Sequence, residues 1–210
     1  MSKKLTDAQI REIASENGLE YGVIKAIYKV ESRGAGFLAD GTPKILFERH
    51  IFYRELQKLG FKTLANQMSA IGTNLCHPRP TPKGGYGGEN AQHTRLLFVQ
   101  NLLLKARPDA DEKLQAQIHE CALKACSWGL GQIMGFNHKL AGFATLQDFI
   151  NAMYESEKAQ LQAMISFLKS AGLAGAMKRK DWHAIARTYN GAAYRKFDYH
   201  NRLARAYATA

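Results

Sequence analysis

The stretch Ile24–His50 reads IKAIYKVESRGAGFLADGTPKILFERH, and it decides the fold that we expect. Its first part carries apolar residues at helical spacing, namely Ile24, Ile27 and Tyr28. Glu31 continues the same helical face, where a carboxylate is costly unless it is protonated or paired. Ser32-Arg33-Gly34 predicts the end of this helix, so Glu31 would lie near the negative pole of the helix dipole.

This position gives Glu31 two interpretations. Desolvation and the helix dipole both raise the pKa of a carboxyl group, which suits a general acid that works near neutral pH. Alternatively, Glu31 only closes the last helical turn and points at water. The stretch alone leaves both interpretations open.

The second part of the stretch predicts a β-hairpin. Asp40-Gly41 is a strong signal for a tight turn, and residues 44–48 have the pattern of a return strand. Leu46 and Glu48 would share one face of that strand. A tight hairpin would bring Glu48 back beside the end of the helix that carries Glu31.

The remaining sequence predicts mainly helices. Their expected ranges are about 6–16, 20–31, 51–59, 91–106, 109–125, 145–169, 181–189 and 201–208. Capping signals begin three of them: Thr6 with Gln9, Thr145 with Asp148, and Asp181. The Gly- and Pro-rich segment 69–89, around Tyr86, predicts a long surface loop, which would be a lid, a ligand clamp or a mobile insertion. We therefore expect one α+β domain, predominantly helical, over residues 1–210.

Composition narrows the possible partners. The chain has 210 residues with 46% hydrophobic residues, enough for a well-buried core, and a net charge of +11. Nucleic acid, an anionic membrane surface and the bacterial cell wall all fit such a charge. Three cysteines without a CxxC pair predict neither a disulfide framework nor a zinc site. The N-terminus lacks the apolar core of a signal peptide, so we expect synthesis without an export signal.

The sequence lacks the motifs of several common enzyme classes. The sequence has no P-loop, no GxGxxG after a strand, no HExxH and no GxSxG, and its seven histidines are scattered. We therefore expect no metal and no cofactor. Basic residues gather near the C-terminus: Lys178, Arg179, Lys180, Arg187, Arg195, Lys196, Arg202 and Arg205. No helix-turn-helix, zinc-finger or single-strand-binding signature accompanies them, so a specific nucleic-acid partner is not expected.

The remaining candidates are Glu31, Glu48, the Gly-rich segment 127–135 and the block Tyr189-Asn190-Gly191. Two carboxylates across a cleft are the minimal requirement for glycoside hydrolysis, because one protonates the leaving oxygen while the other activates water or acts as nucleophile. Amide and hydroxyl side chains such as Gln132, Tyr189 and Asn190 suit sugar hydroxyl and N-acetyl groups, and glycines let a ligand approach the backbone.

Three blocks appear in a specific order: Glu31-Ser32, then residues 127–134 with the pattern Ser-x-Gly-Leu-x-Gln-Ile-Met, then residues 186–191 with Ala-x-x-Tyr-Asn-Gly. This order resembles the lysozyme-like superfamily, especially goose-type lysozymes and soluble lytic transglycosylases. With residues 30–34 and 44–50 added, the sequence is similar to the N-acetylmuramidase domain of bacteriophage endolysins over about residues 19–207, nearly the whole chain.

This resemblance implies a lysozyme-like fold with one small β-hairpin beside the catalytic helix. Glu31 would be the general acid of a muramidase that cleaves the β-1,4 bond from N-acetylmuramic acid to N-acetylglucosamine, and Glu48 the second carboxylate. Asp40 competes for that second role, although Asp-Gly is also the expected hairpin tip, and Arg49 or Arg33 could simply pair with Glu48. The substrate-binding residues would be Gln132, Tyr189, Asn190, Ser127 and Tyr86, while Ser127 and Trp128 could instead only shape their turn.

The resemblance also implies partners and a place of action. The substrate would be peptidoglycan, and the protein a monomer made in the host cytoplasm that reaches the cell wall or periplasm at lysis. Many endolysins of this family carry an N-terminal wall-binding domain, which we do not expect here; the basic charge could instead attract the wall or outer-membrane lipopolysaccharide. Two alternatives remain: a lytic transglycosylase, which needs only one carboxylate and makes 1,6-anhydro-muramic ends, and a non-catalytic basic module that binds wall or nucleic acid.

Overall fold

The computed structural model describes residues 3–32 and 35–210, apart from the side chain of Asn190. The chain divides into two compact units. The first unit comprises Met1–Pro43, Gly129–Ile133 and Asn137–Ala210, and the second comprises Lys44–Trp128 and Met134–Phe136. Each unit is described by itself.

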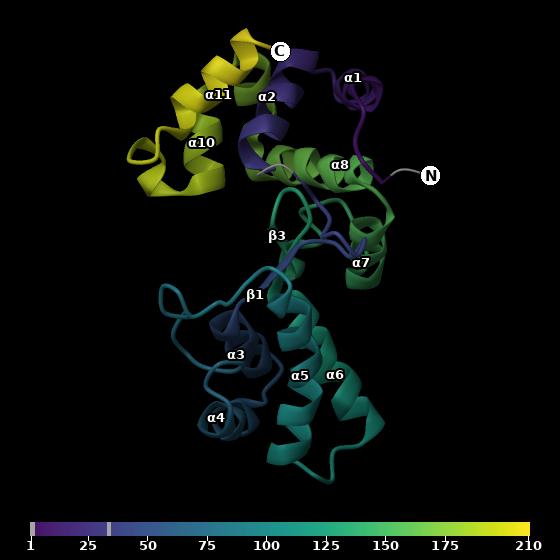
Figure 1. Ribbon diagram of the computed structural model, residues 1–210, viewed down its shortest axis with the longest axis vertical. Helices are drawn as coiled ribbons and strands as arrows, with labels where there is room; N and C mark the ends of the chain where they lie inside the picture. The colour runs from purple at the N-terminus through teal and green to yellow at the C-terminus, as the bar shows by residue number, and fades with distance from the viewer. Residues whose placement is uncertain (1–2, 33–34) are drawn as a thin grey trace. The chain divides into compact units, whose positions relative to one another are not determined.

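The first unit is helical (Figure 1). Its helices are α1 (Asp7–Glu16), α2 (Tyr21–Glu31), α7 (Leu146–Glu155), α8 (Glu157–Leu168), α9 (Ala174–Arg179), α10 (Trp182–Asn190) and α11 (Tyr199–Ala208). The last helix, α11, packs against α2 and α10. Ile24 and Ile27 of the predicted apolar stripe of α2 are buried and Tyr28 is half-buried, while Leu203 of α11 is buried as well. The first unit therefore fixes the helix that carries Glu31 by apolar burial from the C-terminal end of the chain.

The predicted helix starts of this unit are confirmed. Thr6 Oγ1 accepts from the Gln9 backbone N–H at 3.3 Å while Gln9 Oε1 accepts from the Thr6 N–H at 3.0 Å, which is a complete capping box. Thr145 caps α7 through the Asp148 N–H at 3.1 Å, and Asp181 caps α10. Each cap satisfies a backbone donor that the helix itself leaves unpaired.

The single helix predicted over residues 145–169 is wrong, because the structure has two helices there. Ser156 interrupts them in an extended conformation (φ −163°, ψ 159°), and its Oγ caps the new helix through the Ala159 N–H at 3.2 Å. Serine is a favoured N-cap residue, so interrupting the helix at this position costs little free energy. The apolar period continues across the break, which is why the sequence pattern did not reveal it.

The second unit carries α3 (Arg49–Lys58), α4 (Lys62–Ile71), α5 (Ala91–Ala106) and α6 (Glu112–Lys124). Helix α5 packs against both α4 and α6. The core of this unit includes Phe47 and Phe52, whose ring centroids lie 5.8 Å apart. Helix α4 was not predicted, although Leu64, Ala65, Met68 and Ile71 follow a helical spacing.

A three-stranded sheet of order β1-β2-β3 accompanies these helices. Strand β1 (Ile45–Phe47) pairs antiparallel with β2 (Cys126–Trp128), and β3 (Ile133–Met134) follows. The predicted return strand thus exists, but its partner is β2 and not the other arm of a hairpin. Around Asp40-Gly41 the chain forms a tight turn with one isolated bridge, between Phe37 and Pro43. The α+β, predominantly helical class is confirmed.

Residues 72–90 form the predicted loop between α4 and α5, and Ser69–Ile71 belong to α4 instead. Two arginines hold this loop. Arg49 donates to the carbonyl oxygens of Thr73 and Pro80, each at 2.8 Å, and of Arg79 at 3.1 Å. Arg95 donates to the carbonyl oxygens of Gly85 and Tyr86, at 3.3 and 3.1 Å. No helix in the described part of the chain has the length and apolar character needed to cross a membrane.

Candidate active site

Glu31 is the last residue of α2, as the sequence predicts, and it is only 9% exposed. Ser32 follows as the C-cap, and its backbone N–H donates to the Tyr28 carbonyl at 3.1 Å. The helix therefore ends beside a carboxylate that is withdrawn from water. The alternative in which Glu31 points at solvent is wrong.

Tyr189, near the end of α10, joins Glu31 in the first unit. Its hydroxyl group donates a hydrogen bond to the Gly131 carbonyl oxygen. Burial raises the pKa of Tyr189, and the negative charge of Glu31 raises it further. Glu31, Tyr189 and the turn around Gly131 therefore share one neighbourhood. Asn190, the third predicted member, has a side chain outside the described part of the structure.

The turn of residues 129–132 has an unusual backbone. Gln132 adopts a left-handed conformation, with φ +47°, that residues other than glycine rarely adopt, and its side chain is exposed. Its Nε2 donates to the Gly129 carbonyl oxygen at 2.9 Å, which helps to hold that conformation. A side-chain amide is thus presented at a backbone position that costs on the order of 1–2 kcal/mol. Strain of this kind is concentrated at functional sites.

Two polar residues that the sequence analysis missed, Glu157 and Gln160, hold this region together. Glu157 Oε1 accepts from the Gly36 N–H at 2.9 Å, and Oε2 accepts from the Leu5 N–H at 2.9 Å. Gln160 Oε1 accepts from the Leu130 N–H at 2.9 Å. Both side chains are buried. The sequence does carry a signal for them: both are polar residues at positions where the apolar helical period would place a buried side chain.

Glu48 lies in the second unit as the N-cap of α3, with its side chain 17% exposed. Its Oε2 accepts a hydrogen bond from the Tyr86 hydroxyl at 2.8 Å and lies 3.3 Å from His50 Nδ1. Burial raises the pKa of Tyr86, and the bond to Glu48 raises it further. Arg49, which could have paired with Glu48, donates instead to the loop carbonyls described above, and Arg33 lies outside the described residues.

The other candidates have structural contacts. Ser127 and Trp128 are buried in β2, where Trp128 Nε1 donates to the Leu123 carbonyl oxygen at 3.1 Å. Asp40 Oδ1 accepts from both the backbone N–H and the hydroxyl of Thr42, at 2.9 and 2.7 Å, and so stabilises the turn. Within residues 3–32 and 35–210, no cluster of three or more His, Cys, Asp or Glu side chains could hold a metal ion.

Comparison with known proteins identifies the family. A family model described as muramidase, N-acetylmuramidase, matches residues 20–210. The crystal structure of the endolysin from Burkholderia AP3 phage is similar over all of this chain and 72% of that one, with 35% sequence identity and a TM-score of 0.82. No curated protein matches the sequence.

These matches confirm the predicted lysozyme-like endolysin fold and the resemblance to phage muramidases. They favour a peptidoglycan hydrolase over a lytic transglycosylase or a non-catalytic binding module. The chain belongs to the N-acetylmuramidase family, glycoside hydrolases that act on peptidoglycan.

Proposed function

We propose that Glu31 is the general acid that protonates the leaving oxygen when this enzyme hydrolyses the β-1,4 bond between N-acetylmuramic acid and N-acetylglucosamine. The observation that carries the proposal is the burial of Glu31 at the end of α2, beside Tyr189. Withdrawal of a carboxyl group from water disfavours its charged form, which is the condition that a general acid needs.

The residues near Glu31 supply sugar-binding groups in this proposal. The exposed amide of Gln132 offers a donor and an acceptor for an N-acetyl or hydroxyl group. Tyr189 fixes the Gly131 carbonyl and thereby the turn that presents this amide. Asn190, which follows Tyr189 in the sequence, is a further proposed sugar ligand.

Glu48 is the proposed second carboxylate, which activates water or acts as nucleophile. Its bond from Tyr86 orients one oxygen and leaves the other for a ligand or water. Tyr86 thus serves the site by positioning Glu48. Ser127 and Trp128 support the same unit from the core.

The test compares four variants in gels that contain cell wall. Glu31→Gln should lose about 10²–10⁴-fold in clearing rate, because general acid catalysis contributes about that much. Glu48→Gln should also lose activity, while Asp40→Asn should retain it. Glu55→Gln is the matched control, since Glu55 is a buried carboxylate of α3 paired with Lys58.

Mass spectra of the digested wall complete the test, because a hydrolase leaves reducing ends. Equal clearing by the native protein and Glu31→Gln would remove Glu31 from the mechanism. Full activity of Glu48→Gln with loss in Asp40→Asn would move the second role to Asp40.

We also propose that the enzyme acts as a monomer, is made in the phage-infected cell and meets the wall at lysis. The basic C-terminal residues would attract anionic wall polymers and lipopolysaccharide. Within that group, Lys180 pairs with Glu20 at 2.7 Å and Arg205 with Asp198 at 2.9 Å. Neutralising the exposed Lys178, Arg179 and Arg187 should therefore weaken binding to isolated walls at low salt, and unchanged binding would contradict this role.

A further inference from the structure

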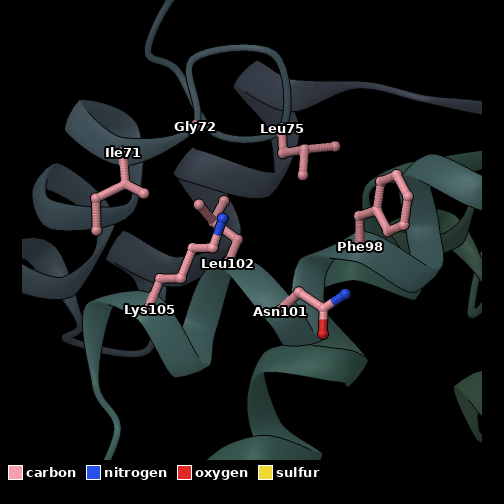
Figure 2. Close-up of a pocket in the computed structure, with 7 residues that line it drawn as sticks. All are labelled: Ile71, Gly72, Leu75, Phe98, Asn101, Leu102 and Lys105. Atoms are coloured by element: carbon pink, nitrogen blue, oxygen red, sulfur yellow. The ribbon is translucent and has the colours of Figure 1, made fainter.

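The second unit contains a groove between the end of α4, the start of the loop 72–90 and one face of α5. Two cavities of about 280 and 510 Å3 form it, and they share the lining residues Ile71, Gly72, Leu75 and Phe98. Figure 2 shows the first cavity, with the side chains of Ile71, Leu75 and Phe98 around it and Lys105 reaching over Leu102. The two cavities adjoin along these four shared residues, and together they are called the groove.

The groove combines apolar walls with positive charge. Ile71 and Phe98 are 49% and 50% exposed, so both offer apolar surface to a ligand. Lys105 lines the first cavity and Arg95 the second, and no acidic residue lines either. Such a surface suits a ligand that carries apolar groups and carboxylates along one chain.

Among the described residues neither Arg95 nor Lys105 forms an ion pair with a carboxylate, although the charge of Glu48 acts on Arg95 from a longer distance. Arg95 donates to carbonyl oxygens of the loop, which carry no net charge. In the described ranges 3–32 and 35–210, Lys105 forms no ion pair. A bound carboxylate would therefore meet positive potential at both ends of the groove.

Tyr86 connects this groove to Glu48, the proposed second carboxylate. It lines the second cavity, and its hydroxyl group donates to Glu48 at 2.8 Å. A branch of the glycan chain that leaves the sugar near Glu48 therefore has a path into the groove. In peptidoglycan that branch is the peptide stem of muramic acid, a short chain with methyl side chains and free carboxylates.

We propose that this groove binds the peptide stem of peptidoglycan and makes the enzyme prefer stem-bearing glycan. The proposal rests on the proposed glycan cleavage near Glu48. A lipid surface fits the groove less well, because membrane attraction grows by about 1 kcal/mol with each basic residue that faces the membrane, and only two line this groove. Its concave wall also suits an extended peptide.

The experiment measures hydrolysis of two substrates by the full-length protein. One is intact peptidoglycan, and the other is the same glycan after an amidase has removed the stems. Lys105→Glu and Phe98→Ala should raise KM about tenfold on the first substrate and leave the second unchanged, since each removes about 1.4 kcal/mol of stem binding. The matched controls are Lys62→Glu, an exposed cation of α4, and Leu97→Ala, 69% exposed on α5 and not part of the groove lining.

Equal losses on both substrates, or none on either, would overturn the proposal. Direct binding of a free stem tripeptide, followed by NMR, separates this proposal from the role of Glu31. Glu31→Gln should keep that binding, whereas Lys105→Glu should weaken it, whatever Glu31 does in catalysis. If Lys105→Glu instead weakens only binding to vesicles with anionic headgroups, the groove is a lipid site and the peptide assignment is wrong.

Discussion

A Cβ atom added to Gly36 would lie only 1.9 Å from Gln160 Oε1. Residue 36 must therefore be glycine as long as the Gln160 amide keeps its position. The amide cannot easily move away. Its oxygen accepts from the Leu130 N–H at 2.9 Å, and its nitrogen donates to the Met153 carbonyl at 2.7 Å. Gly129 is in the same position, because its Cβ would lie 2.7 Å from Gln160 Cδ. One buried glutamine therefore requires glycine at both positions.

Gly36→Ala should lower the free energy of unfolding by about 1–3 kcal/mol, the usual cost of forcing an extra carbon into a packed site. Gly88→Ala is the control, because nothing lies within 4 Å of its added Cβ, and it should change stability by less than about 1 kcal/mol. Urea unfolding measures both. In a Gln160→Ala background the cost of Gly36→Ala should shrink, and strictly additive costs would show that the clash is not with Gln160.

Local features of this fold could be predicted from the sequence, and contacts between distant segments could not. Thr6, Thr145 and Asp181 predict where their helices begin, because each capping side chain lies three residues from the backbone N–H that it satisfies. The pairing of Ile45 with Trp128 joins residues 83 positions apart, and no local pattern specifies it.

The site shows the same division. The position of Glu31 at the end of α2 could be predicted because the apolar period of this helix leads to it, but its burial could not, since the stretch alone left a solvent-facing carboxylate open. The bond from Tyr86 to Glu48 depends on the path of an irregular loop, which side-chain periodicity does not report. Glu157 and Gln160 depend on the break at Ser156, which the continuous apolar pattern concealed.

The three cysteine thiols should be unreactive in the native protein. Burial raises the pKa of Cys76 and of Cys121 from 9.0 to about 12, and raises that of Cys126 as well. The thiolate is the reactive form, so native protein at pH 8 should react with Ellman's reagent only after unfolding.

The same raised pKa values predict that the stability of the protein depends on pH. Below about pH 9 the thiols are protonated in both states and their contribution is constant; above it only the unfolded state ionises.

Stability should therefore fall as pH rises from about 9 towards 12, by up to about 1.4 kcal/mol per pH unit for each buried thiol. Urea midpoints between pH 8 and 11 measure the fall, and Cys76→Ala should make it shallower. Rapid labelling of any thiol in the folded protein at pH 8 would contradict the burial argument.

Arg49→Lys should loosen the loop 72–90 while leaving the fold intact. The guanidinium reaches three carbonyl oxygens at once, of Thr73, Arg79 and Pro80, and an ammonium group lacks the planar geometry to replace all three bonds. Trypsin cleavage after Lys83, in that loop, should become about tenfold faster, as expected for the loss of about 1.4 kcal/mol of local stability. Arg54→Lys is the control, since Arg54 stacks over Phe136 and, within the described part of the chain, its hydrogen bond goes to Glu55 and not to the loop. Equal cleavage rates in the two variants would mean that the loop is held mainly by Arg95.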